Sequence, residues 1–392
     1  ALTGTLLQID QVFFPGLAML TPVILAVIVM IYIVLIIMEF VAATIRIKLI
    51  TVSLAIVLFP LILLSFIQSA FLQNAISTQN QQAFRLVGAQ VARRVDDFFT
   101  SNITQLEKQA ELPVYSRYLQ LASIDRRSSA EEAEIRSIFR SLEAVSTNYR
   151  PSFAILNSFG INIFDTNPLY QGNLEGNTPY FSEPLRTGRS FASPVVYTYN
   201  APYIYFSTPI RNERSQIIGV LRMRYDALIL QSIMNEYIGI IGGRSYPVLL
   251  DENLIRIADT INPDLVFRSM RALDADTITK LVNNKQVDPD IDPAQISAPQ
   301  PEVVSAVENL NVTPYFTTEF HSEGSNHTEA GIVVRTSAKP WYVLILQETT
   351  AQELISQNQQ RLSTVIAAIL AGMVGLITAF SSTVFSQPIL DL

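Results

Sequence analysis

The stretch Phe206–Leu230, FSTPIRNERSQIIGVLRMRYDALIL, decides the fold. Apolar residues recur with a period of two on both sides of the polar turn Arg211–Arg214, and this period is typical of β-strands. We therefore predict strands at Tyr203–Ile210 and Gln216–Tyr225, joined by that turn. The chain is expected to continue as a helix over Ala227–Tyr237.

Strand signals also precede this hairpin. Phe153–Leu156 and Ile161–Asp165 flank Asn157–Gly160, and this order predicts another hairpin because Asn, Ser and Gly favour tight turns. A loop rich in Gly, Asn and Pro follows at residues 166–181. One more strand is predicted at Ser193–Tyr199.

A second, shorter copy of the pattern begins at Tyr246. Tyr246–Leu250 and Leu254–Asp259 flank the polar turn Asp251–Asn253 and predict a further hairpin. A helical, polar insertion and a loop rich in Pro and Asp, residues 287–302, come next. Later strands are predicted at Tyr315–His321, Gly331–Thr336 and Trp341–Gln347. The sequence therefore predicts two α+β modules in series.

A long amphipathic helix is predicted ahead of the two modules. Its apolar residues fall at three- and four-residue steps: Phe84, Val87, Val91, Val95 and Phe98. Pro113 is expected to end this stalk, and a second helix is predicted at Ala130–Ser146. The stalk can pack on its own module, on a second copy of the chain, or on both.

Three stretches carry no charge and are long enough to cross a bilayer, which takes about 20 residues. They are Gly16–Met38, Leu49–Phe71 and Leu362–Phe385. The turn between the first two, residues 39–48, holds Arg46 and Lys48, and basic residues favour the cytoplasmic side.

This charge distribution predicts the topology. Residues 1–15 and 72–360 are expected outside the cytoplasm, and the third span returns the chain to it. We therefore expect a multi-pass protein of the inner or plasma membrane.

Composition excludes several classes of function. The chain has no cysteine, two histidines and a net charge of −7. A disulfide framework, a thiolate or multi-histidine metal site and a general nucleic-acid binder are therefore not expected. The sequence also shows no convergent acid, base and nucleophile, so we expect no enzyme in this segment, and no cofactor or metal.

Three motifs in this order carry a resemblance to a known family. Phe206–Leu230, YPVLLDENLIRIADTINPDLVF at Tyr246–Phe267 and KPWYVLILQE at Lys339–Glu348 resemble the double-Cache (dCache) sensor domains of bacterial receptors. SQPILDL, Ser386–Leu392, resembles the start of a HAMP signalling linker.

The resemblance implies an α+β fold of tandem PAS-like modules on a long stalk helix, with transmembrane helices on both sides. Residues 72–150 would form the stalk and second helix. Residues 151–240 would form the membrane-distal module and residues 241–360 the membrane-proximal one.

The resemblance also implies where a ligand would bind, because family members bind small ligands mainly in the distal module. Many amino-acid-binding members carry Arg-x-Trp-Tyr there, and this chain has Thr178-Pro179-Tyr180-Phe181. Thr178 replaces the arginine that would hold a carboxylate, and Arg224 falls near the acid that would hold an amine. An amino-acid ligand is therefore not favoured.

The remaining candidate ligand-binding residues are aromatic, weakly polar or basic. They are Tyr170, Thr178, Tyr180, Phe181, Tyr197, Tyr199, Tyr203, Tyr205, Arg222 and Arg224. Tyrosine suits a pocket because it has a flat apolar body and a hydroxyl at its rim. Ordinary strand packing is the alternative for the tyrosines, and a solvated sheet face with acidic neighbours is the alternative for the two arginines.

The third span carries small residues at four-residue spacing, which lets two helices approach closely. They are Ala368, Ala371, Gly372, Gly375 and Ala379. We expect a homodimer or a membrane-complex partner through the stalk and the spans, with the lipid bilayer as surroundings. Three Asn-x-Ser/Thr sequons begin at Asn102, Asn311 and Asn326.

Two functions remain open from the sequence. The first is a membrane-anchored sensor whose distal module binds a small ligand or partner and signals through the third span to a cytoplasmic effector. The second is a structural or accessory subunit of a larger membrane assembly, with the ectodomain used for protein contacts.

Overall fold

The protein is described from a computed structural model, which covers residues 81–348 except 146–148, 150, 199–200, 288–290, 293–294 and 323–324. The three predicted spans, the beginning of the stalk, the HAMP-like linker and the small residues Ala368, Ala371, Gly372, Gly375 and Ala379 lie outside this part. Within it, no helix combines the length and apolarity that crossing a bilayer requires.

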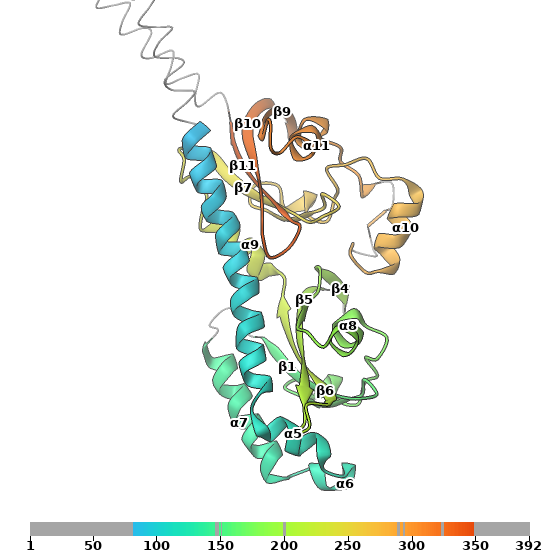
Figure 1. Cartoon of the computed structure of the whole chain (residues 1–392). Coiled ribbons are helices and arrows are strands. Elements are labelled where there is room, and N and C mark those ends of the chain that lie inside the picture. The colour runs from blue at the N-terminus through green and yellow to red at the C-terminus, as the bar shows by residue number, and fades with distance from the viewer. Residues whose placement is uncertain are drawn as a thin grey trace, which may run out of the picture. The chain divides into compact units, whose positions relative to one another are not determined.

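The stalk is helical over residues 81–110 and runs along both modules (Figure 1). Its predicted apolar face is buried in this chain's own core, with Phe84, Val91 and Val95 at most 4% exposed. Contact with a second copy stays a prediction. Asn102 is buried on the same helix and donates to the Phe98 carbonyl at 2.7 Å, so this sequon is not an accessible acceptor.

Three short helices follow the stalk: α5 (Pro113–Gln120), α6 (Ser123–Arg126) and α7 (Ala130–Val145). Pro113 begins α5, as a proline can where no intrahelical N–H bond is needed. The Phe139 ring of α7 stacks between Tyr115 and Phe153, at centroid distances of 5.8 and 4.9 Å. The aromatic stack joins these helices to the first strand.

The distal sheet has six antiparallel strands in the order β2-β1-β6-β5-β3, with β4 paired to β5. They are β1 (Ser152–Asn157), β2 (Asn162–Asp165), β3 (Phe191–Ala192), β4 (Val196–Thr198), β5 (Ala201–Arg211) and β6 (Ile217–Asp226). A 3₁₀ turn η1 (Pro168–Tyr170) and helix α8 (Pro179–Thr187) lie between β2 and β3. Both hairpins predicted for this sheet are confirmed.

The proximal sheet has five antiparallel strands in the order β8-β7-β11-β10-β9. They are β7 (Ser245–Leu250), β8 (Arg256–Asp259), β9 (Tyr315–Ser322), β10 (Ser325–Arg335) and β11 (Tyr342–Glu348). Its helices are α9 (Leu228–Asn235), η2 (Pro263–Leu265), α10 (Ala275–Asn283) and α11 (Pro301–Glu308). The loop predicted over 287–302 is wrong at its end, because Pro301 begins α11.

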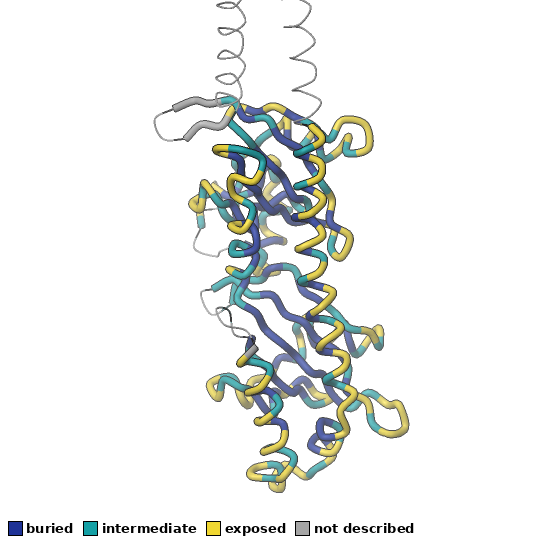
Figure 2. The backbone as a smooth tube through the Cα atoms, turned by 90° about the vertical axis from the view of Figure 1, so that its left-hand side faces the viewer, coloured by how far each residue is buried: buried dark blue, intermediate teal, exposed yellow. Residues whose placement is uncertain are grey.

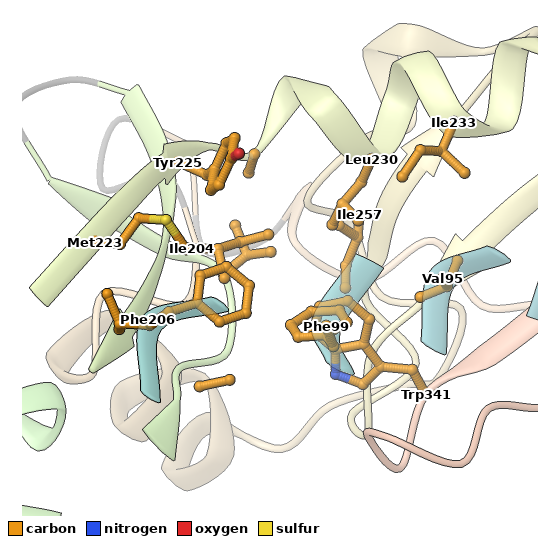
Figure 3. Close-up of a cluster of buried hydrophobic side chains, with 14 of the residues drawn as sticks. Val95, Phe99, Ile204, Phe206, Met223, Tyr225, Leu230, Ile233, Ile257 and Trp341 are labelled. Carbon is orange, nitrogen blue, oxygen red and sulfur yellow. The ribbon is translucent and has the colours of Figure 1, made fainter. Parts of the chain in front are cut away.

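One hydrophobic cluster joins the stalk to both sheets, and the strands of both sheets are mostly buried (Figure 2). Phe99 of the stalk packs edge-on against Trp341 at 5.1 Å and contacts Phe206 of β5 at 5.6 Å. Leu230 of α9 and Ile257 of β8 complete the contact region between the modules (Figure 3). The stalk therefore shares a core with both modules.

Gly219→Ala is expected to lower the free energy of unfolding by about 1–3 kcal/mol, because overpacking a core forces backbone shifts. A Cβ at Gly219 would lie 2.8 Å from Leu119 Cδ1 and would overlap the Leu156 carbonyl oxygen. Urea unfolding followed by circular dichroism measures the loss. Gly243→Ala is the control, since nothing lies within 4 Å of its Cβ position; equal effects of the two changes would contradict the packing argument.

Candidate functional site

A cavity of about 1000 Å³ lies on the face of the distal sheet that points away from the stalk. Its wall comes from the loop after η1, the start of α8, the link between β3 and β4, strands β4 and β5, and the turn at residues 283–286 at the end of α10. Ligand pockets typically measure about 300–1000 Å³. The cavity is therefore large enough for a small metabolite.

Strand register gives this face its polar character. Arg222 of β6 lies opposite Ala154 of β1 and Ser207 of β5, and Arg224 lies opposite Tyr205. Alternate residues of a strand point to opposite faces, so Phe206 and Met223 reach the stalk side instead. The predicted shared face of the two arginines is consistent with this pairing.

Arg222 is 1% exposed and lies between two acids. Its Nη2 donates to Asp165 at 2.6 Å, and its Nε lies 3.3 Å from Glu175 Oε2. The Asn162 amide donates to both acids, at 2.8 and 2.9 Å. Burial opposes the charge of Arg222, but Glu175 and Asp165 outweigh it and raise the pKa of the guanidinium. The acidic neighbours were anticipated, whereas the solvated face is wrong.

Arg224 is also buried, and its guanidinium lies over two aromatic rings. The centroids of Tyr170 and Tyr203 are 4.3 and 4.8 Å from it. Cation–π contacts of this kind are worth about 0.5–2 kcal/mol. Because Tyr170 belongs to η1, the contact holds that turn on the sheet.

Tyr180 and Tyr205 form an aromatic part of the cavity wall. Their rings stack at 4.2 Å with an interplanar angle of 14°, and the Tyr205 hydroxyl is 2.9 Å from that of Thr198. Burial raises the pKa of both phenols, and Glu175 adds to the shift at Tyr180. Both hydroxyls therefore stay protonated at neutral pH and can donate hydrogen bonds.

The structure brings together some of the candidate residues and separates others. Thr178, Tyr180 and Tyr205 line the cavity. The buried Arg222 and Arg224 form a polar and aromatic cluster on the same face with the half-buried Tyr170 and Tyr203. Phe181 packs with Leu156 and Val220, and Tyr197 packs on Phe267 at 4.9 Å, so these two belong to cores. Tyr199 lies outside the described residues.

The sequence analysis allowed for acidic neighbours of the two arginines but did not identify Asp165 and Glu175, and it missed the turn at residues 283–286 as part of the cavity wall. Asp165 could have been found from a sequence repeat. The segment Asp165-Thr166-Asn167-Pro168 is similar to Asp259-Thr260-Ile261-Asn262-Pro263 of the second module. Each aspartate ends its edge strand and accepts backbone N–H bonds from the turn that follows. Glu175 and the turn 283–286 carried no comparable signal.

The equivalent face of the proximal sheet is partly covered by α11, and it has two smaller pockets, of about 470 and 440 Å³, beside α11 and β9. Leu344 occupies the register position of Arg222, two strands from Asp259, and Gly331 occupies that of Tyr205. Val303 and Ala306 of α11 pack into the apolar cluster on this face. The cavity therefore depends on Arg222 and Tyr205, which the proximal module replaces with smaller or apolar residues.

A chain of contacts leads from the cavity to the stalk. Ser193 lines the cavity and exchanges two hydrogen bonds with Tyr205, at 2.8 and 2.9 Å. The neighbouring Ala192 carbonyl accepts from Lys339 Nζ. Lys339 lies in the turn between β10 and β11, whose Ser337 and Ala338 amides donate to Asp96 of the stalk at 2.9 and 2.7 Å.

Lys339→Met is expected to remove a pH-dependent part of the stability. Burial lowers the pKa of Lys339 to about 8. The unfolded chain then binds the extra proton between about pH 8 and 10.5, so stability rises with pH across this window, by up to about 1.4 kcal/mol per unit. Below about pH 8 the full penalty is present.

The measurement is the free energy of unfolding of both proteins at pH values from 7 to 10.5. The exposed Lys280→Met serves as the matched control and is expected to keep the wild-type slope. An identical slope in Lys339→Met would contradict the assignment of the effect to this lysine.

Within the described part of the chain, no cluster of three or more His, Asp or Glu side chains could hold a metal ion. Glu175 and Arg222 are ion-paired, Arg224 lies over the rings of Tyr170 and Tyr203, and Lys285 is exposed.

Comparison with known proteins gives a family match. A family model of the dCache type, described as a Cache domain, matches residues 68–354. No curated protein sequence matches the chain.

Solved structures give the same fold. The sensor domain of the V. cholerae histidine kinase DctB is 16% identical, with a TM-score of 0.50, over 69% of this chain and 98% of that one. The sensory domain of the Campylobacter jejuni chemoreceptor Tlp3 is 17% identical, with a TM-score of 0.46, over 72% and 98%. At these identities the likeness concerns the fold alone.

Proposed function

Because this chain belongs to the double-Cache family of sensor domains, we propose that it is a membrane-anchored extracytoplasmic sensor that binds a small molecule in its distal module. The observation that supports this function is the cavity of about 1000 Å³ lined by Tyr180 and Tyr205. The pockets of the proximal module are smaller, at about 470 and 440 Å³, because Val303 and Ala306 of α11 pack on its sheet.

The signal would leave the cavity through Tyr205. A ligand that shifts the Tyr205 backbone would move Ser193 and Ala192, and with them the carbonyl that Lys339 contacts. The turn that holds Lys339 is bonded to Asp96, so the stalk would shift relative to the distal sheet. Small displacements of packed helices are a common form of such transitions. The predicted third span would carry the displacement to a cytoplasmic effector.

Ligand binding is expected to raise the thermal stability of the full chain in lipid nanodiscs. A compound at 100 times its dissociation constant adds about 2.7 kcal/mol. For a protein of this size that corresponds to a midpoint shift of about 2–4 °C. The measurement is thermal unfolding against a panel of metabolites.

Tyr180→Ala is expected to abolish this shift, because it removes one ring of the stacked pair. Tyr315→Ala is the matched control: this half-buried tyrosine of the proximal module lies away from the cavity. Loss of the shift in both variants would argue against a site at Tyr180. A panel in which no compound shifts the midpoint would contradict small-molecule sensing and favour the structural-subunit function.

A further inference from the structure

We propose that the ligand of this cavity is an uncharged, hydroxyl-rich molecule of the sugar class, held between the distal sheet and the turn at residues 283–286 of the proximal module. The inference rests on the sensing function proposed above. It specifies the class of ligand and the role of the turn at residues 283–286 as the part of the cavity wall that the proximal module supplies.

The first step concerns charge. Among the described residues of the cavity wall, Glu175 is the one acid and Lys285 the one cation. Glu175 is ion-paired with Arg222 and bonded to Asn162, and Arg222 also bonds to Asp165. Lys285 is an exposed residue at the edge of the cavity.

The paired charges of the wall also limit the charge that a ligand can carry. A buried charge without a partner costs several kcal/mol, so a ligand carboxylate or ammonium gains little here. The buried charges of the site are paired with one another before any ligand arrives, because Arg222 bonds to Asp165 and lies 3.3 Å from Glu175. The buried Nη1 of Arg222 makes no hydrogen bond. An uncharged ligand meets no such penalty.

The second step concerns hydrogen bonding. Five carboxamides line the cavity: Asn173, Asn177, Asn283, Asn284 and Gln286. Each carries a donor and an acceptor, and a ligand hydroxyl offers both as well. The protonated hydroxyls of Tyr180, Tyr205 and Thr198 add further groups of the same kind. This set matches a molecule with many hydroxyls around its edge.

The third step concerns shape. Pro179 and Pro194 lie in the wall beside the stacked rings of Tyr180 and Tyr205. A flat apolar surface next to carboxamides suits the C–H face of a sugar ring, which is apolar while its edge is polar.

The fourth step concerns the turn after α10. Lys285 has a φ of +57°, a left-handed conformation that is uncommon for a non-glycine residue. Its carbonyl accepts the Tyr197 amide of β4 at 2.6 Å. The turn is therefore docked on the distal module and presents Asn284 and Gln286 to the cavity. A ligand bonded to them would contact both modules at once.

The experiment measures binding by calorimetry to the full chain in nanodiscs. The probes are neutral mono- and disaccharides, compared with amino acids, organic acids and amines. A saccharide is expected to bind, and Asn284→Ala and Gln286→Ala are each expected to weaken it about tenfold, or 1.4 kcal/mol. Both positions lie in a surface turn, so the fold should survive. Asn311→Ala, an exposed carboxamide elsewhere in the proximal module, is the control and should leave affinity unchanged.

Three results would overturn the inference, and they differ in what else they affect. Binding of a charged compound in place of saccharides, lost in Tyr180→Ala, would refute the ligand class and leave sensing intact. Saccharide binding that survives both Asn284→Ala and Gln286→Ala would refute the claim that the turn at residues 283–286 contacts the ligand. Failure of every compound class to bind would contradict the sensing function as well.

Discussion

Arg222→Met is expected to lower the free energy of unfolding by about 3–5 kcal/mol, the usual cost of breaking a buried ion pair from one side. Arg222 is 1% exposed and pairs with both Asp165 and Glu175. Methionine fills similar space but leaves both carboxylates buried without their cation. Chemical unfolding of the full chain followed by circular dichroism measures the loss.

Two further variants separate charge from packing. Arg186→Met removes an exposed arginine paired with Glu183 and should change stability far less than Arg222→Met, because solvent screens an exposed ion pair. Adding Asp165→Asn and Glu175→Gln to Arg222→Met removes the stranded charges, and much of the lost stability should return. No recovery in the triple variant would show that the loss came from packing and not from charge.

The strands of this region could be predicted from the sequence because their alternation is local. The hairpin around Arg211–Arg214 is such a case, and the common face of Arg222 and Arg224 follows from the two-residue period alone. The two α+β modules were predicted in the same way from hairpin signals at either end of each sheet. These features need only neighbours in the sequence.

The surroundings of the same arginines could not be predicted. Asp165 and Glu175 reach Arg222 from an edge strand and a loop about 50 residues earlier in the chain, and burial depends on how α8 covers the sheet. A pair of basic residues on one strand face is compatible with solvent or with acids. Only the tertiary arrangement distinguishes them.

The turn at residues 283–286, which forms part of the cavity wall, could be predicted even less, because its position depends on contacts between the modules. Asn283 and Asn284 lie in a polar insertion of the second module, and nothing local connects them to Tyr180. Tyr197 was a reasonable ligand candidate from its type, yet its ring packs on Phe267 of the proximal module. Contacts between modules decide both outcomes.

The two sheets show how few changes separate a binding face from a packed one. Both have the same strand order, and both keep an aspartate followed by an Asn-Pro turn. Leu344 in place of Arg222 removes the cation that organises the distal polar cluster. Val303 of α11 then packs into an apolar face, and the proximal module serves as support for the stalk and the turn 283–286.

Trp341→Ala is expected to cost about 3–5 kcal/mol of stability, as large-to-small changes of buried aromatics do. The side chain of Trp341 is 0% exposed, packs edge-on against Phe99 at 5.1 Å and donates from Nε1 to Glu252 at 2.9 Å. Trp341 follows the turn that holds Lys339. The variant should therefore loosen the connection between the stalk and the proximal module.

Trp341→Phe distinguishes the ring from its hydrogen bond. It keeps an aromatic contact with Phe99 and loses the bond to Glu252, so a smaller loss of about 1–2 kcal/mol is expected. Phe159→Ala, which removes an aromatic ring that is 76% exposed, should change stability by less than about 0.5 kcal/mol. Because Trp341 is the single tryptophan of the chain, unfolding of all three variants is followed by circular dichroism. If Trp341→Ala cost no more than Phe159→Ala, the shared core of stalk and proximal module would be refuted, and with it the route by which the distal cavity is proposed to move the stalk.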